Sequence, residues 1–246
     1  MTADLLSRIP LPEPSGFIPT LNRMGYMTST LDPVSCSFIG FSSVASGPVL
    51  DVGAAYGIAS RQALRTGAKV AVNDLDSRHL DLLRDSISLK SEQSRLSLHP
   101  GDFLSIDWEK DHYGAVLVAR VLHFLDGPAF EAAARKLYDL LAPGGRCYIV
   151  CETAWLRNFQ SFIPEFEQRI SQGDLWPGLI HDVMRVAPDR GASLPKLLNF
   201  VTPQVLRRVF EAAGFKTLLC TTMARTDFPA DLQWDGRESA GYVGEK

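Results

Sequence analysis

The sequence lacks several features that define large classes of protein. Its four cysteines form no Cys-x-x-Cys pair, and they do not cluster with the five histidines at metal-ligand spacing. No apolar run approaches the roughly 20 residues that cross a bilayer, and the chain does not begin with a basic and then apolar leader. We therefore expect a cytoplasmic protein with free thiols, no metal site and no membrane segment.

The chain also lacks an excess of basic residues. It has 25 Lys and Arg against 28 Asp and Glu, a formal charge of −3, so no overall basic field could hold a phosphate backbone. Nucleic acid is therefore not expected as a partner. Of the 246 residues, 46% are hydrophobic, which is the ordinary globular range and suffices for one large domain.

Proline divides the chain into three kinds of segment. Five prolines interrupt residues 1–47, which are expected to form an irregular N-terminal cap. From Gly47 onwards short apolar strands alternate with helical stretches, the pattern of stacked β-α units. Residues 153–200 break this alternation with four prolines, and we expect an insertion over the carboxyl edge of the sheet. Residues 1–246 are thus predicted to be one domain with a lid from two segments.

The apolar periodicity places the individual elements. The expected strands cover residues 49–53, 69–74, 95–99, 115–119, 146–151 and 215–222. The expected helices cover residues 58–66, 77–89, 130–141 and 203–213, the last with Thr202 as its N-cap and Gly214 just beyond its end. These elements predict an α/β fold with a doubly wound, mostly parallel sheet and helices on both faces.

A turn of small residues, Gly53, Ala55 and Gly57, follows the first of these strands. Such residues let the backbone approach a ligand closely, and the next helix offers free N–H groups. Asp74 lies 21 residues beyond Gly53, at the end of the next strand, where an acid can accept from both ribose hydroxyls. The alternative for Asp74, and for Asp76, is an N-cap of the following helix. Together these features predict a nucleotide-binding turn.

Asp51, inside this motif, indicates which nucleotide binds. The spacing Asp-x-Gly-x-Ala-x-Gly departs from the Gly-x-Gly-x-x-Gly of dinucleotide sites. A carboxylate repels a diphosphate and suits a cation, such as the sulfonium of a nucleoside that carries an amino acid. An NAD-dependent oxidoreductase is therefore the disfavoured alternative. Asp51 as a local turn organiser also stays open.

Five stretches in combination resemble the class I S-adenosylmethionine-dependent methyltransferases: residues 49–57, Asp74, 101–103, 140–146 and 213–215. The resemblance spans residues 47–152 and 201–246. It departs from the family at Ala55, where a glycine is more usual. The resemblance implies a seven-stranded Rossmann-like sheet with an antiparallel edge strand from residues 238–245. It also implies a transferase that uses S-adenosyl-L-methionine and releases S-adenosyl-L-homocysteine.

Carried over position by position, the resemblance implies a set of cofactor-binding residues. The small turn residues would line the methionine part of the donor, and Asp74 would hold the ribose. Asp102 would accept from the adenine amino group, and Phe103 would pack beside the ring; Asp102 as a simple turn residue is the alternative. The full expected set is Tyr26, Asp51, Gly53, Ala55, Gly57, Asp74, Leu75, Asp102, Phe103 and Ala119.

Methyl transfer from a sulfonium is an in-line displacement, so alignment matters more than an enzyme nucleophile. A base is needed only when the acceptor arrives protonated. His123, just past strand 115–119, is the candidate base, and Glu152, after strand 146–151, is the candidate acid facing the acceptor. The alternatives are a structural histidine and a solvated acid. Arg120 could pair with an acidic substrate or with an acid of the fold.

The default acceptor is an oxygen or nitrogen atom of a small molecule. Strand 115–119 is not followed by the Asn-Pro-Pro-Tyr type of turn found in similar methyltransferases that act on nucleic-acid amines. A protein side-chain methyltransferase and a non-catalytic donor-binding module remain alternatives, and a monomer or homodimer is expected. Aromatic residues could enclose a sulfonium or an aromatic acceptor, or pack the lid; these are Tyr26, Trp155, Phe159, Phe162 and Trp176.

Overall fold

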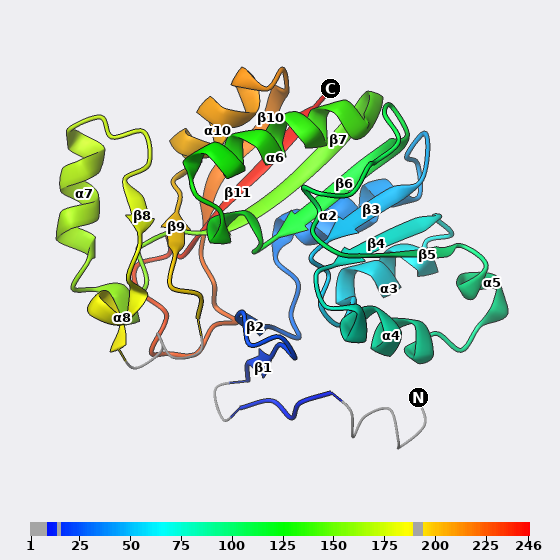
Figure 1. Ribbon diagram of the computed structural model, residues 1–246, viewed down its shortest axis with the longest axis horizontal. Helices are drawn as coiled ribbons and strands as arrows, with labels where there is room; N and C mark the ends of the chain where they lie inside the picture. The colour runs from blue at the N-terminus through cyan, green and yellow to red at the C-terminus, as the bar shows by residue number, and fades with distance from the viewer. Residues whose placement is uncertain (1–8, 14–15, 189–193) are drawn as a thin grey trace.

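The computed structural model describes residues 9–13, 16–188 and 194–246. Its centre is a seven-stranded sheet in the order β10-β11-β7-β6-β3-β4-β5 (Figure 1). The strands are β3 (Val49–Val52), β4 (Val70–Asp74), β5 (Leu96–Pro100), β6 (Tyr113–Ala119), β7 (Leu141–Glu152), β10 (Lys216–Met223) and β11 (Ser239–Glu245). Strands β3 to β7 pair in parallel. The predicted doubly wound α/β fold is confirmed.

The C-terminal residues form the antiparallel strand β11, as the resemblance implied, but the prediction that this strand lies at the edge of the sheet is wrong. β11 pairs antiparallel with β7 on one side and with β10 on the other. β10 is therefore the outermost strand, and β11 lies second from the edge. A register shift between Thr217 and Leu219 bends β10, as bulges on edge strands do.

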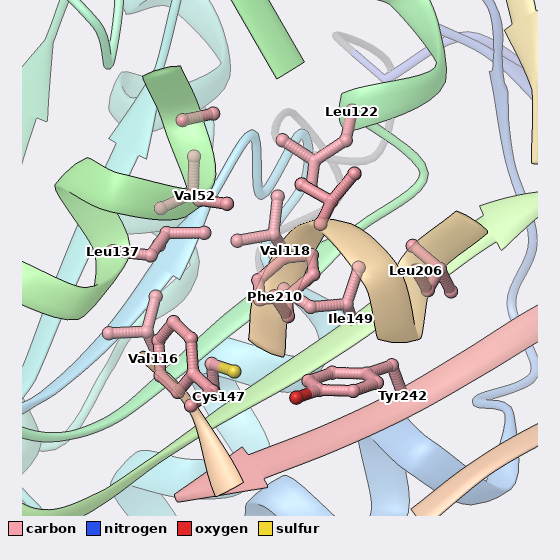
Figure 2. Close-up of a cluster of buried hydrophobic side chains, with 14 of the residues drawn as sticks. Val52, Val116, Val118, Leu122, Leu137, Cys147, Ile149, Leu206, Phe210 and Tyr242 are labelled. Carbon is pink, nitrogen blue, oxygen red and sulfur yellow. The ribbon is translucent and has the colours of Figure 1, made fainter. Parts of the chain in front are cut away.

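Helices cover both faces of the sheet (Figure 1). The α-helices of the described residues are α2 (Pro33–Ser42), α3 (Ile58–Arg65), α4 (Ser77–Ser86), α5 (Lys90–Gln93), α6 (Gly127–Leu140), α7 (Ile163–Ser171), α8 (Val183–Val186) and α10 (Pro203–Ala212), of which α7 and α8 belong to the insertion and lie away from the sheet (Figure 1). Helices α6 and α10 pack on one face, where Leu137 and Phe210 meet Val116 and Ile149 (Figure 2). Helices α2, α3 and α4 pack on the other face. Successive side chains of a strand point to opposite faces of the sheet, so each strand contributes apolar residues to the core on either face.

Element ends differ from the predicted ones for local reasons. α4 ends at Ser86 instead of residue 89, because Ile87 is extended and turns its buried side chain into the core. α6 begins at Gly127, three residues early, because the Asp126 side chain caps it by accepting from Ala129 N–H. β7 begins at Leu141, since that residue already pairs with Tyr113. The Thr202 cap of α10 is confirmed.

The strand order reverses between β3 and β6. From β3 the chain proceeds outwards through β4 and β5, whereas β6 and β7 continue on the other side of β3. The loops after β3 and β6 therefore diverge and leave a crevice at the carboxyl ends of these strands. In this fold class the crevice is where a ligand binds.

The predicted insertion, residues 153–200, builds a small core of its own. It holds α7, α8 and the antiparallel pair β8 (Gly178–Ile180) and β9 (Leu198–Phe200). Its buried aromatics pack with Phe17 and with Phe228 from the loop before β11. The N-terminal segment adds a second small pair, β1 (Ile18–Pro19) and β2 (Tyr26–Met27). Residues 1–8, 14–15 and 189–193 of the predicted cap and insertion lie outside the described residues.

Within the described residues, no helix has the length and apolar character needed to span a bilayer. The same part of the chain contains no group of three or more His, Cys, Asp and Glu side chains arranged to hold a metal ion. The four cysteines are free thiols; Cys147 and Cys151 are buried in the sheet and Cys36 is exposed.

Candidate active site

A cavity of about 390 Å³ occupies the crevice between β3 and β6. One half of its wall is the turn after β3, the end of β4 and the loop after β5. The other half is largely apolar and comes from the N-terminal segment, the turn after β6, the insertion and the loop before β11; its aromatic residues include Phe124, Phe159, Phe200 and Phe228. A ligand that enters this space meets polar groups on one side and aromatic side chains on the other.

The turn after β3 has the backbone that the small residues predicted. Gly53 has φ +66°, and a Cβ there would lie 2.3 Å from Val121 Cγ2, so the loop after β6 excludes a side chain. Ala55 has φ +47°, a left-handed conformation that favours glycine. Its N–H donates to Asp74 Oδ2 at 2.8 Å. This bond ties the turn to the next strand and helps to hold Ala55 in its strained conformation.

Asp74 lies on the cavity wall but is already engaged within the protein. Its Oδ1 accepts from Asp76 N–H and from His79 Nδ1, both at 2.9 Å. A carboxylate offers about four acceptor positions, and these two bonds plus that from Ala55 occupy three of them. One position therefore remains for a ligand hydroxyl, where the sequence had suggested two. Asp76, the alternative, is the N-cap of α4, because it accepts from Arg78 N–H.

Asp51 also lies on the cavity wall, with 4% of its surface exposed. Ser60, from the first turn of α3, donates to its Oδ2 at 2.5 Å. Burial raises the pKa of Asp51 to about 7; the Ser60 bond lowers it and the charge of Asp74 raises it further. The carboxylate is thus a buried, poorly compensated acid whose ionised form a cation would stabilise.

Asp102 and Phe103, in the loop after β5, line the cavity. The Asp102 carboxylate also organises its own turn, since it accepts from Leu104 N–H at 3.1 Å and from Ser105 Oγ at 2.7 Å. Both readings of Asp102 are therefore compatible with its position. The Phe103 ring packs against Trp108 at a centroid distance of 5.9 Å and is 8% exposed.

Most of the remaining expected residues reach the cavity. Tyr26, Leu75 and Ala119 line it, whereas Gly57 does not. Gly57 precedes α3 with φ +66°, and a Cβ there would contact Leu83 Cδ1 at 2.6 Å. Its small size serves the packing of α3 on α4.

Of the aromatic candidates, some line the cavity and others pack inside the protein. Phe159 lies on the cavity wall, as Tyr26 does. Trp155 and Phe162 pack inside the insertion core. Trp176 packs on Phe130 of α6 at a centroid distance of 5.3 Å.

His123 lies in the turn after β6, on the cavity wall, and is 5% exposed. Its Nδ1 accepts from Glu152 N–H at 3.3 Å, which assigns the proton of the neutral ring to Nε2. Burial lowers the pKa of His123 to about 3, and the nearby charge of Arg120 lowers it further. In this tautomer the free ring nitrogen offers a proton to a ligand and has no lone pair with which to accept one.

Arg120 and Glu152 face the same side of the cavity without a direct hydrogen bond. Arg120 Nε lies 3.7 Å from Glu152 Oε1, and the guanidinium donates to Thr28 Oγ1 at 3.2 Å. Glu152 accepts instead from Ser239 Oγ at 2.7 Å. Burial raises the pKa of Glu152, while Arg120 and Arg225 act in the opposite direction. The structure thus places Glu152 in a buried ionic cluster, not in solvent.

Several site residues had no clear signal in the sequence. Many of these residues belong to residues 17–31, which we call the N-terminal strap and which contribute to the wall of the cavity. Leu21 N–H donates to His79 Nε2 at 3.0 Å, and Tyr56 Oη donates to Pro19 O at 2.7 Å. His79 could have been suspected as a polar residue on the inward face of α4. Phe228 could not, because its loop reaches the cavity only through the tertiary fold.

Part of the chain, including the loops that form this cavity, matches a known protein family. Residues 49–145 match the family model described as "Methyltransferase domain". This range begins with β3 and ends within β7, so it contains the turn, Asp74, Asp102 and His123. No curated protein sequence matches this chain.

Solved structures with a similar fold include three methyltransferases. The 1,6-didemethyltoxoflavin-N1-methyltransferase of Burkholderia thailandensis, with S-adenosylhomocysteine bound, is 16% identical, with 87% of this chain and 78% of that chain covered and a TM-score of 0.59. A methyltransferase from Methanosarcina mazei described as S-adenosylmethionine-dependent is 13% identical, with coverages of 88% and 98% and a TM-score of 0.62. A glycopeptide N-methyltransferase bound to S-adenosylhomocysteine is 15% identical, with coverages of 86% and 87% and a TM-score of 0.56. At these identities the likeness concerns the fold.

Proposed function

We propose that this chain is a class I S-adenosylmethionine-dependent methyltransferase that methylates an oxygen or nitrogen atom of a small-molecule acceptor. The observation that carries the proposal is the cavity at the carboxyl ends of β3 and β6. It joins the polar turn and Asp74 to an apolar wall made by the strap and the insertion. A donor and an acceptor can therefore lie side by side in one space.

The polar half of the cavity suits the donor. Asp74 has one acceptor position left for a ribose hydroxyl, and Asp51 provides an acid whose ionised form needs a cation. Gly53 and Ala55 bring backbone to the wall without a bulky side chain. When bound, the donor supplies an electrophilic methyl group on a positively charged sulfur. Tyr26, Leu75, Asp102, Phe103 and Ala119 complete the proposed donor wall.

The chain's own contribution is orientation. Alignment of two reactants supplies about 7–11 kcal/mol in well-oriented systems, which exceeds the roughly 10²–10⁴-fold of a general base. His123 presents Nε2–H in the observed tautomer, so we assign it the role of a hydrogen-bond donor that orients the acceptor. The backbone N–H of Glu152 donates to His123 Nδ1 and so helps to orient the ring. The Glu152 carboxylate accepts from Ser239 within the ionic cluster.

Residues 1–47 and 153–200 are proposed to act together as the lid. The described part of both segments meets in one apolar cluster, which contains Phe17, Phe159 and Phe200. This cluster closes the cavity on the acceptor side. A concave, largely apolar space of this size suits a small molecule.

The test is to incubate the protein with S-adenosylmethionine labelled on its methyl group and a cell extract. We expect label in the small-molecule fraction, with none in protein or nucleic acid. Label in polypeptides would replace the proposed acceptor class by protein side chains. Donor binding by calorimetry without transfer to any fraction would instead indicate a binding module.

A further inference from the structure

We propose that the acceptor carries an oxyanion, such as a carboxylate, and that this group binds the guanidinium of Arg120 on the lid side of the cavity. The inference rests on the proposed function, because it names the chemical class of the acceptor of that reaction. It assigns to Arg120 the role of a specificity-determining residue.

Arg120 is distinguished first by its charge. Among the described residues that line the cavity, it is the only Arg or Lys. The carboxylates on the same wall all have other hydrogen-bond donors: Asp32 accepts from Ser35 and Glu152 accepts from Ser239. Asp51, Asp74 and Asp102 are engaged as described above.

The guanidinium is also poorly satisfied. It makes one hydrogen bond within the described part of the chain, to Thr28 Oγ1, although a guanidinium has five N–H donors. The nearby Arg225 shows the contrast: it binds both oxygens of Asp227, at 2.9 and 2.7 Å. A partly buried guanidinium with unused N–H donors on a cavity wall is suited to donate to the two oxygens of a ligand carboxylate.

The backbone at Arg120 supports a functional reason for this placement. Its φ of +61° is a left-handed conformation, which is strained for a residue with a side chain. The surrounding structure maintains it, since Arg120 N–H donates to Val150 O at 2.7 Å. Such strain at a cavity wall is a feature of ligand sites.

The position of the side chain favours the acceptor over the donor. The Arg120 guanidinium lies 5.7 Å from the ring centroid of Phe228, which belongs to the apolar cluster of the lid. It donates to Thr28 of the strap, whereas the proposed ribose and adenine positions, at Asp74 and Asp102, follow β4 and β5 on the other side of β3. An acceptor with an apolar body would lie along this wall with its oxyanion at Arg120.

Electrostatics point the same way. Burial lowers the pKa of Arg120, and the charge of Arg225 lowers it further, while Glu152, Asp32 and Asp227 act in the opposite direction. Glu152 lies 3.7 Å from Arg120 Nε but accepts from Ser239, so no carboxylate of the described residues is hydrogen-bonded to the Arg120 guanidinium. A bound anion would favour the charged form of Arg120 further.

A second polar group on the acceptor wall remains without a partner. Asn158 lines the cavity, and its buried Oδ1 has no hydrogen-bond partner among the described residues. An O–H or N–H group on the acceptor would satisfy this oxygen. Hydroxy- and amino-substituted aromatic acids combine both properties and are suitable probes.

The test compares each acid with its uncharged amide. Para-hydroxybenzoate, para-aminobenzoate and para-coumarate, with their primary amides, are titrated by calorimetry into protein saturated with S-adenosylhomocysteine. We expect at least one acid to bind about 10- to 100-fold more tightly than its amide, the effect of hydrogen bonds to a charged group. Arg120→Met should abolish the difference and leave the affinity for S-adenosylhomocysteine unchanged.

Two further variants serve as controls. Arg120→Lys should restore part of the acid preference, which separates the charge from any loss of folding. Arg208→Met, on the surface of α10, removes an arginine outside the cavity and should keep the full preference. Wild-type protein that prefers no acid over its amide would overturn the proposal. So would an Arg120→Met variant that loses affinity for S-adenosylhomocysteine, since Arg120 would then hold the carboxylate of the donor.

Failure of the proposed function would look different. Wild-type protein that binds neither S-adenosylmethionine nor S-adenosylhomocysteine would refute the methyltransferase reaction. The acid preference is then measured on the protein alone, where its presence supports the anion site and its absence overturns it.

Discussion

His79 donates from Nδ1 to the Oδ1 atom of Asp74 across 2.9 Å, while its Nε2 accepts from the backbone of Leu21. The ring is 1% exposed and connects the acid proposed to hold the ribose with the strap that covers the cavity. Arg78 adds a second link, because it donates to Leu21 O at 3.1 Å. Closure of the strap and orientation of Asp74 are therefore coupled through one imidazole.

Replacement of His79 should affect donor binding and strap order together. His79→Phe keeps a ring but removes both hydrogen bonds, each contributing about 1 kcal/mol. We expect S-adenosylmethionine to bind several-fold more weakly and the strap to become sensitive to protease. Leu21→Pro is the matched control, because it removes only the strap donor and should leave the Asp74 contact in place. Wild-type affinity in His79→Phe would show that the connection has no functional effect.

Asp51 should lose a proton when a cationic donor binds. Its pKa is about 7, so near neutral pH a fraction of the protein carries the proton, and a nearby sulfonium favours the ionised form. Calorimetry in two buffers of different ionisation heat should report this proton release. The range of about pH 6 to 7 is suitable, because a large share of Asp51 is protonated there before the donor binds. Asp51→Asn should abolish the release. S-adenosylhomocysteine, which lacks the sulfonium charge, should release less.

The same acid predicts a pH dependence of stability. Unfolding returns the pKa of Asp51 from about 7 to its usual 3.8, so between these values the native state binds more protons than the unfolded state. The contribution of Asp51 to the free energy of unfolding is therefore largest below pH 4. It decreases as the pH rises to about 7 and is constant above that. Chemical denaturation of Asp51→Asn should show a flatter profile than the wild type; parallel profiles would refute this assignment.

Ala55→Gly should stabilise the protein. The left-handed backbone at φ +47° costs an alanine roughly 1–2 kcal/mol, and the greater freedom of glycine in the unfolded chain offsets about 0.4–1 kcal/mol of that. We expect a net gain between about 0 and 1.6 kcal/mol in the free energy of unfolding. Ala54→Gly, next to it, has no positive φ and should destabilise the protein. A loss of stability in Ala55→Gly would show that the methyl group contributes more than the backbone strain.

His123 should remain neutral throughout the physiological range. With a pKa of about 3, its ring resonances in NMR should not shift between pH 8 and pH 5. Arg120→Met should move this pKa upwards, because it removes a nearby positive charge. His123→Ala should leave donor affinity unchanged and slow transfer to the acceptor. Titration of the wild-type ring near pH 6.5 would contradict the buried, Nε2-protonated state and restore His123 as a base.

The fold could be predicted because its signals are local. The apolar runs of β3, β4 and β6, the Thr202 and Asp76 caps, and the glycine turn each depend on neighbours in sequence. Element ends were less accurate where packing or pairing decided them, as at Ile87 and Leu141. The antiparallel pairing of β11 came from the family resemblance, since periodicity alone does not specify strand order.

The donor half of the site was accessible to sequence reasoning for the same reason. Asp51, Gly53, Ala55 and Asp74 belong to consecutive β-α units, and parallel strands bring their ends to one edge of a sheet. Their spacing therefore already implied their proximity. It did not reveal that three of the acceptor positions of Asp74 are occupied within the protein.

The acceptor half depended on contacts between distant segments. Thr28, Arg120, Glu152 and Phe228 come from four parts of the chain, and only folding brings them to one wall. Glu152 accepts from Ser239 and makes no hydrogen bond to Arg120, so the guanidinium keeps unused N–H donors. The sequence alone does not show which of these two partners Glu152 binds. Short-range periodicity thus specified the individual strands and the donor turn, whereas the partners of buried charges were decided by long-range packing.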